Sequence, residues 1–238
     1  PKPQNPSYQL FLFLFILTPS VVSAEVHEAT LNNGMKIFVK EDTRSPVVVS
    51  QVWYRAGSID EVNGKTGIAH VLEHMMFKGT KTSRPGEFSE IIAAAGGREN
   101  AFTGADYTCY FQQLEKSQLP VALKMEADRM QNLIITEEEF NKEINVVMEE
   151  RRWRTDDKPT SKANELMQSL AFVSHPYGRP IVGWMDDLEN MHYSDAQEWY
   201  NDWYAPNNAI LVVAGDVSST DVFKLAKKYF GNIPSRKI

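Results

Sequence analysis

The segment HVLEH, from His70 to His74, restricts what this chain can fold into more than any other stretch of its 238 residues. It lies within GIAHVLEHMMFKGT, in which apolar residues recur at the spacing of an amphipathic helix, namely Ile68, Val71, Leu72, Met75 and Met76. A helix turns by about 100° per residue, so His70 and His74 fall on one face a turn apart and Glu73 lies beside them. The pattern therefore predicts a helix on which two imidazoles and a carboxylate converge on one point.

This combination of side chains is what a catalytic zinc site requires. Neutral ring nitrogens hold the metal, and a nearby carboxylate takes a proton from the water that the metal binds. The order H-x-x-E-H is the inverzincin motif, the reverse of H-E-x-x-H. Two histidines on an amphipathic helix would also suit the surface or the edge of a core, and so short a pattern arises by chance as well. The surrounding sequence has to decide between these readings.

A third ligand is expected on a second helix, because a zinc hydrolase usually has three protein ligands and one open position. The segment TEEEFNKEINVVMEERR predicts a helix that begins at Thr136, with Glu139 completing a capping box. Glu143 and Glu150 differ by only about 20° around this helix and flank its apolar stripe, whereas Glu149 points nearly opposite. Glu150 can therefore reach a site walled by the core. The alternative is a charged surface face, which most Glu-rich helices have.

Together these segments resemble the pitrilysin/insulinase family of zinc peptidases, including the mitochondrial processing peptidase branch and its bacterial relatives. HVLEH is followed about 76 residues later by Glu150, inside EINVVMEERRWRTDD. The stretches GGRENAFTGADYTCYF, WYNDWYAPNNAILVVAGDV and KKYFGNIP are similar to that family too. The resemblance thus extends from Val26 to Pro234.

The resemblance implies a role for each residue of the motif. His70, His74 and Glu150 would hold one zinc ion per chain, Glu73 would be the general base, and Glu143 would be an accessory carboxylate that steadies the site. A set of two nitrogens and one oxygen would also accept cobalt or manganese. The implied activity is that of a zinc-dependent metalloendopeptidase, which hydrolyses peptide bonds in extended peptides or unfolded segments.

The segment ENAFT is the candidate for peptide binding. An exposed strand edge can pair with an extended peptide through backbone hydrogen bonds. In the family that the chain resembles, the strand matching Asn100, Ala101 and Phe102 lies along the substrate beside the zinc. The alternative is an ordinary edge strand protected by its polar neighbours.

The family resemblance also implies a partner. Its members are built from two or four related domains, and this chain ends at Ile238, where the first such domain would end. We therefore expect a second homologous domain or a partner chain to complete the substrate wall. The alternative function, from a different class, is a non-catalytic assembly or peptide-binding subunit of a two-chain complex, although such subunits usually have eroded zinc motifs.

The first residues indicate export. A continuous apolar run from Leu10 to Val22 follows Lys2 and precedes a small-residue step that ends at Ala24. Because a membrane span needs about 20 apolar residues, this shorter run is interpreted as a signal peptide over residues 1–24. A buried strand or an uncleaved anchor is the alternative. Residues 25–238 would then form the N-terminal zinc peptidase domain, without a membrane span after cleavage, and would lie in the periplasm of a bacterium.

Along residues 25–238, predicted strands alternate with predicted helices. A hairpin turning at Asn32-Asn33-Gly34, a central apolar strand in VVVSQVWYRAGS and a buried strand in NAILVVAGDV are the clearest strand signals. The order predicts an α+β layered sandwich, a mixed or antiparallel sheet with helices packed on it. A net charge of −6 with interspersed signs argues against a nucleic-acid partner. Cys109 is the single cysteine and is expected to be a small buried side chain.

Overall fold

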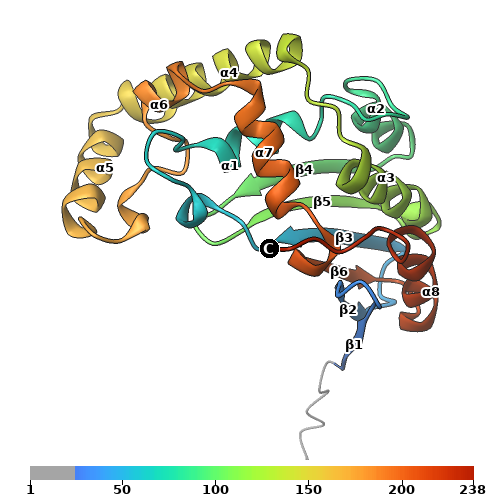
Figure 1. Ribbon diagram of the computed structural model, residues 1–238. Coiled ribbons are helices and arrows are strands. Elements are labelled where there is room, and N and C mark those ends of the chain that lie inside the picture. Colours follow the sequence, from blue (N-terminus) through green and yellow to red (C-terminus); the bar gives the residue numbers. More distant parts are fainter. Residues whose placement is uncertain (1–24) are drawn as a thin grey trace, which may run out of the picture.

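The computed structural model describes residues 25–238, which form a six-stranded sheet with helices packed on it (Figure 1). The predicted signal peptide, residues 1–24, lies outside the described residues. Within residues 25–238, no helix is both long enough and apolar enough to cross a membrane.

The sheet is mixed, which confirms the predicted α+β class. Its strand order is β1-β2-β6-β3-β5-β4, and the β2–β6 pair is parallel while the other pairs are antiparallel. The strands are β1 (Val26–Thr30), β2 (Lys36–Glu41), β3 (Val47–Tyr54), β4 (Arg98–Thr103), β5 (Thr108–Glu115) and β6 (Ala209–Gly215). Strand β6 comes last in the sequence but lies between β2 and β3, so the C-terminal residues complete the sheet rather than form a separate one.

The predicted hairpin at Asn32-Asn33-Gly34 is present, and strands β4 and β5 form a second one. Strands β1 and β2 pair in the register Thr30↔Lys36, and the turn between them contains Gly34, whose φ of +89° a glycine adopts without strain. Strands β4 and β5 pair from Arg98↔Gln113 to Thr103↔Thr108. This second hairpin leaves β4 at the edge of the sheet, because β5 is its one neighbour in the strand order.

Eight α-helices cover the sheet and connect its strands in the described part of the chain. They are α1 (Ile68–Met75), α2 (Glu87–Ala94), α3 (Leu119–Asn132), α4 (Glu137–Arg151), α5 (Pro159–Ala171), α6 (Met185–Glu189), α7 (Tyr193–Trp203) and α8 (Ser219–Phe230). At the start of α4, the Thr136 hydroxyl accepts a hydrogen bond from the Glu139 N–H, as the sequence predicts. The π-helical segment from Arg152 to Asp156 was not predicted.

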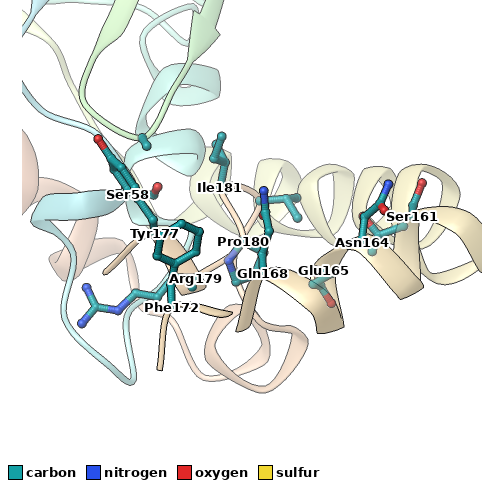
Figure 2. Close-up of a pocket in the computed structure, with 14 residues that line it drawn as sticks. Ser58, Ser161, Asn164, Glu165, Gln168, Phe172, Tyr177, Arg179, Pro180 and Ile181 are labelled. Carbon is teal, nitrogen blue, oxygen red and sulfur yellow. The ribbon is translucent and has the colours of Figure 1, made fainter. Parts of the chain in front are cut away.

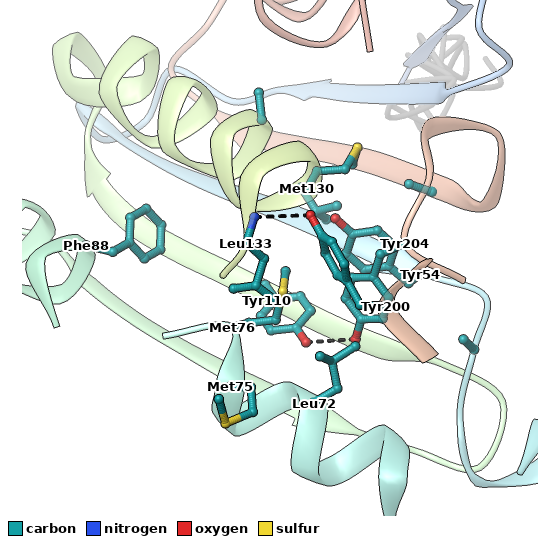
Figure 3. Packing of buried hydrophobic residues seen from close by; sticks show 14 of the residues in the cluster. Tyr54, Leu72, Met75, Met76, Phe88, Tyr110, Met130, Leu133, Tyr200 and Tyr204 are labelled. Carbon is teal, nitrogen blue, oxygen red and sulfur yellow. Dashed lines mark hydrogen bonds between the residues drawn. The ribbon is translucent and has the colours of Figure 1, made fainter. Parts of the chain in front are cut away.

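Helix α1 is the most deeply packed helix, and Figure 1 shows it between α4 and strand β4. Seven of its eight residues are buried, and Leu72 and Met75 have no exposed surface. Figure 3 shows Leu72 pointing toward the tyrosines of the sheet and of α7. There Tyr110 and Tyr204 share a hydrogen bond of 2.8 Å between their hydroxyls. The side chains of α1 are therefore placed by a close-packed core rather than by a loop.

We predict that Leu72→Ala destabilises the protein by about 2–5 kcal/mol, because it leaves a cavity beneath α1. Leu166→Ala is the matched control: Leu166 is 60% exposed on α5, so its loss should change stability by no more than roughly 0.5 kcal/mol. Urea unfolding at neutral pH, followed by circular dichroism, measures both. Equal effects of the two substitutions would contradict the described packing.

Candidate metal centre

The start of α1 is fixed by a buried carboxylate. Glu61 is 3% exposed and accepts hydrogen bonds from the backbone N–H groups of Gly67 and Ala69, at 2.9 and 3.0 Å. These are two of the donors that a helix N-terminus leaves unpaired. Burial raises the pKa of Glu61 to about 8, against the two hydrogen bonds, which lower it. The first turn of α1 is thus held in one orientation.

Gly67, just before α1, permits this arrangement. Its φ is +88°, and a Cβ atom there would lie 2.6 Å from the carbonyl oxygen of Val182. Only glycine combines that backbone conformation with so close an approach. The loop before α6 therefore packs directly against the start of the helix that carries the two histidines.

The structure brings His70, His74 and Glu150 together, from α1 and α4. The Nε2 atoms of His70 and His74 lie 3.7 and 3.4 Å from the same carboxylate oxygen, Oε2 of Glu150. One donor atom from each residue lies within 4.8 Å of the other two, and no second group of this kind occurs in residues 25–238. A tetrahedral zinc ion with bonds of about 2.0–2.2 Å holds its donors about 3.3–3.6 Å apart. The donor set therefore fits a zinc ion, and the separations of the two histidine nitrogens from Glu150 are close to these distances.

Both imidazoles present nitrogen atoms to the same point. Their rings are 4.8 Å apart at 80°. His70 is 8% exposed, and burial, with a smaller contribution from the neighbouring His74, lowers its pKa to about 3. The ring is therefore neutral at pH 7 and its Nε2 can offer a lone pair, as a metal ligand must. The Nδ1 atom of His70 is buried and has no hydrogen-bond partner among the described residues.

Glu143 lies behind His74 rather than at the donor point. Its Oε2 is 3.3 Å from Nδ1 of His74, and its Oε1 is 2.6 Å from Nζ of Lys78. With the Nδ1 proton directed at Glu143, Nε2 of His74 remains free to bind a metal, which is the usual arrangement behind a ligating histidine. Sequence reasoning placed Glu143 near the site but missed Lys78, whose position in the motif FKGT was the available signal.

Glu73 projects from α1 into the same region. Its side chain is 9% exposed, and its Oε2 accepts a hydrogen bond of 2.5 Å from the hydroxyl of Thr103, the last residue of β4. Burial raises the pKa of Glu73, and the Thr103 hydrogen bond opposes that rise. Thr103 was also missed, although it ends the ENAFT segment that was singled out for peptide binding.

Glu150 is held from the far side by the π-helical segment. Nη1 of Arg154 lies 2.8 Å from Oε1 of Glu150, which leaves Oε2 facing the histidines. Short π-helical stretches within α-helices are frequent at functional sites. Glu149 behaves as the sequence predicts, since its side chain is 71% exposed and pairs with Arg152.

A cleft of about 910 Å³ opens over these residues, lined by α1, β4, the end of α4, the π-helical segment and the loop before α6. The predicted peptide-binding residues Asn100, Ala101 and Phe102 form one of its walls. A second cavity of about 520 Å³ shares Thr155, Ile181 and Val182 with the cleft. Figure 2 shows this second cavity, with Asn164 of α5 on one side and Tyr177 on the other.

Comparison with known proteins identifies the family. Residues 36–184 match the profile of the insulinase family, peptidase family M16. The chain belongs to the insulinase family. Residues 190–238 match the profile described as the M16 inactive domain. That second match covers α7, β6 and α8, of which β6 is an inner strand of the same sheet.

Relatives of this insulinase-family chain include bacterial proteins named as zinc proteases. It is 41% identical to the zinc protease PqqE of Helicobacter pylori over 209 residues, which cover 87% of this chain and 47% of PqqE. It is 32% identical to the uncharacterized zinc protease YmxG of Bacillus subtilis, covering 87% of this chain and 50% of YmxG. The chain thus spans about half the length of the curated relatives it matches.

Solved structures share the fold. A protease from Helicobacter pylori superposes with a TM-score of 0.88 at 39% identity, covering 90% of this chain and 52% of that one. The first half of the periplasmic protease PqqL from Escherichia coli superposes with a TM-score of 0.82 at 24% identity, covering 89% of this chain and 47% of that one. The second likeness is one of fold alone.

We predict that Lys78→Met lowers the affinity for Zn²⁺ by about 10–100-fold, because residues behind a metal ligand usually contribute this much. The substitution leaves Glu143 without its ion-pair partner and so loosens the orientation of His74. Lys81→Met is the control, since Lys81 is exposed on the same segment. Competition with a chromogenic chelator measures both affinities, and equal values for the two variants would rule out the role of Lys78.

Proposed function

We propose that this chain is the catalytic domain of a zinc-dependent metalloendopeptidase that cleaves extended peptides or unfolded segments. The observation that carries the proposal is the convergence of His70, His74 and Glu150 at separations suited to one zinc ion. Membership of the insulinase family and relatives named as zinc proteases support it. One zinc ion per chain is proposed because these residues form the one such group in residues 25–238.

The proposed reaction divides the work among four side chains. A zinc ion held by His70, His74 and Glu150 would lower the pKa of its water toward about 7 and polarise the scissile carbonyl. Glu73 removes the proton of the attacking water and returns it to the leaving amine. Its position supports this role, because it borders the cleft beside the donor atoms without being one of the three grouped donors.

The substrate is proposed to bind along β4. Its outer edge is unpaired within the described sheet, so the backbone of Asn100, Ala101 and Phe102 can hydrogen-bond to an extended peptide. Phe102 is 38% exposed and packs edge-to-face against Trp53, with ring centroids 5.4 Å apart. Backbone pairing of this kind suits many sequences, which is what an enzyme acting on unfolded segments needs.

We further propose that a second homologous domain or partner chain completes the cleft. PqqE and YmxG are about twice as long as the matched part of this chain. This chain also covers only about half of each of the two solved structures described above. Export to the periplasm is proposed from the apolar run before Ala24.

The metal ligands are tested by a pair of neighbouring substitutions on α4. We predict that Glu150→Gln abolishes stoichiometric zinc binding, because an amide is a poor zinc ligand, whereas Glu149→Gln retains it. Atomic emission analysis of the dialysed proteins gives the zinc content of each. Stoichiometric zinc in Glu150→Gln would contradict the assignment.

The general base is tested by Glu73→Gln. The variant should keep one zinc per chain and lose cleavage of an unstructured fluorogenic peptide by at least about 10²-fold, since a positioned general base contributes that much. Loss of zinc along with activity would show that Glu73 is a ligand instead.

The same assay separates catalysis from binding alone. It is run with the protein as encoded, including any second half or neighbouring homologous chain. Zinc binding without cleavage in every pairing would favour the peptide-binding subunit as the function of this chain.

A further inference from the structure

Thr103 holds the carboxylate of Glu73 from the substrate strand. Its hydroxyl donates to Oε2 of Glu73 at 2.5 Å, and this is the one side-chain hydrogen bond to that carboxylate within residues 25–238. The other oxygen, Oε1, has no hydrogen bond there and is not among the fully buried unpaired atoms, so it faces the cleft. Oε2 of Glu73 is thus held by a hydrogen bond, and Oε1 is not.

The strand places the Thr103 hydroxyl rigidly. Burial alternates along β4, so Thr103 shares its side with Glu99 and Ala101, toward the helices, while Asn100 and Phe102 point the other way. Thr103 pairs with Thr108 of β5, whose own hydroxyl is bonded to the Ala56 carbonyl. A β-branched side chain also has few χ1 choices. The hydroxyl is therefore a fixed anchor point for a glutamate that has three rotatable side-chain bonds.

Resting on the function proposed above, we propose that Thr103 is a positioning residue for Glu73. By holding Oε2, it keeps the carboxylate beside the metal centre but not on it, and it directs Oε1 at the water. Without this anchor the glutamate is free to turn toward the donor atoms of His70, His74 and Glu150, which line the same cleft. A carboxylate that swings onto the metal would occupy the position that the water needs.

This arrangement also links the base to the substrate. Thr103 directly follows Asn100, Ala101 and Phe102 on β4. A peptide that pairs with this edge is therefore positioned by the same strand that orients Glu73. Removal of the anchor should then reduce the chemical step rather than peptide binding.

The test uses Thr103→Val, which keeps the shape and removes the donor, and Thr103→Ser, which keeps the donor. Thr103→Ala accompanies them, because it differs from Thr103→Ser by a single oxygen atom and stays informative if the valine variant folds poorly. In the protein as encoded, the valine and alanine variants should lose kcat by about 10–100-fold, in line with small misplacements of catalytic groups. KM and zinc content should stay unchanged, and the serine variant should retain most of the activity.

A second readout does not depend on cleavage. With Co²⁺ in place of zinc, the visible spectrum reports the ligands of the metal. Thr103→Val should alter that spectrum as the freed Glu73 reaches the ion, Thr103→Ser should not, and the double variant Thr103→Val with Glu73→Gln should restore it. Non-additivity of this kind identifies two residues that act through one another.

The outcomes separate the two proposals. Loss of kcat or a changed cobalt spectrum that serine reverses supports Thr103 as the anchor of Glu73. Equal behaviour of the serine, alanine and valine variants, or loss of zinc from the valine variant, overturns it. If the wild-type protein cleaves nothing while the cobalt spectrum still depends on Thr103 and Glu73, the peptidase function fails and the anchoring stands.

Discussion

The packing of α1 against the core is the constraint on which the site depends. A short helix of eight residues would not hold its shape alone in water. Here its apolar face is buried against the sheet and α7, and Glu61 satisfies its first N–H groups. Because the helix is held at its start and along its buried face, His70, Glu73 and His74 have defined positions. Even these polar residues are largely buried, so the precision of the site comes from the core beneath it.

Burying so many charged groups at one place is costly unless they balance. Glu73, Glu143 and Glu150 gather around the rings of His70 and His74, and the nearby cations are Lys78 and Arg154. Three carboxylates beside two cations leave an excess of negative charge, which attracts a metal cation. Metal binding in such sites contributes to folding free energy, because the ligands are not assembled in the unfolded chain. The electrostatics of the cluster and its ligand chemistry thus favour the same occupant.

Local periodicity was enough to predict much of this arrangement. The helical spacing around HVLEH placed both histidines on one face of α1, and the helical wheel of α4 separated the inward Glu150 and Glu143 from the outward Glu149. The hairpins followed from turn residues, and the strands followed from apolar runs. These features are set by neighbours close in sequence, which is why a single sequence reveals them.

Contacts between distant segments were not predictable in the same way. Lys78 meets Glu143 across 65 residues, and Thr103 meets Glu73 across 30. A single lysine or threonine in a sequence does not indicate a role at a site. The packing of α1 against α4 and β4 brings Lys78 and Thr103 to their partners. The π-helical segment after Glu150 also escaped prediction, since its extra residue per turn has no clear composition signal. Tertiary context decided these features.

The site therefore combines residues from two helices with residues from an edge strand. The metal ligands come from two helices, whereas the proposed peptide edge belongs to a strand at the border of the sheet. Glu73 lies on α1, beside the metal ligands, and accepts a hydrogen bond from Thr103 of the edge strand β4. A peptidase needs its base to be correctly placed relative to both the metal and the substrate backbone, because proton transfer depends on hydrogen-bond distances to each. A single carboxylate that is carried by α1 and hydrogen-bonded to β4 meets that requirement without any movement of the sheet.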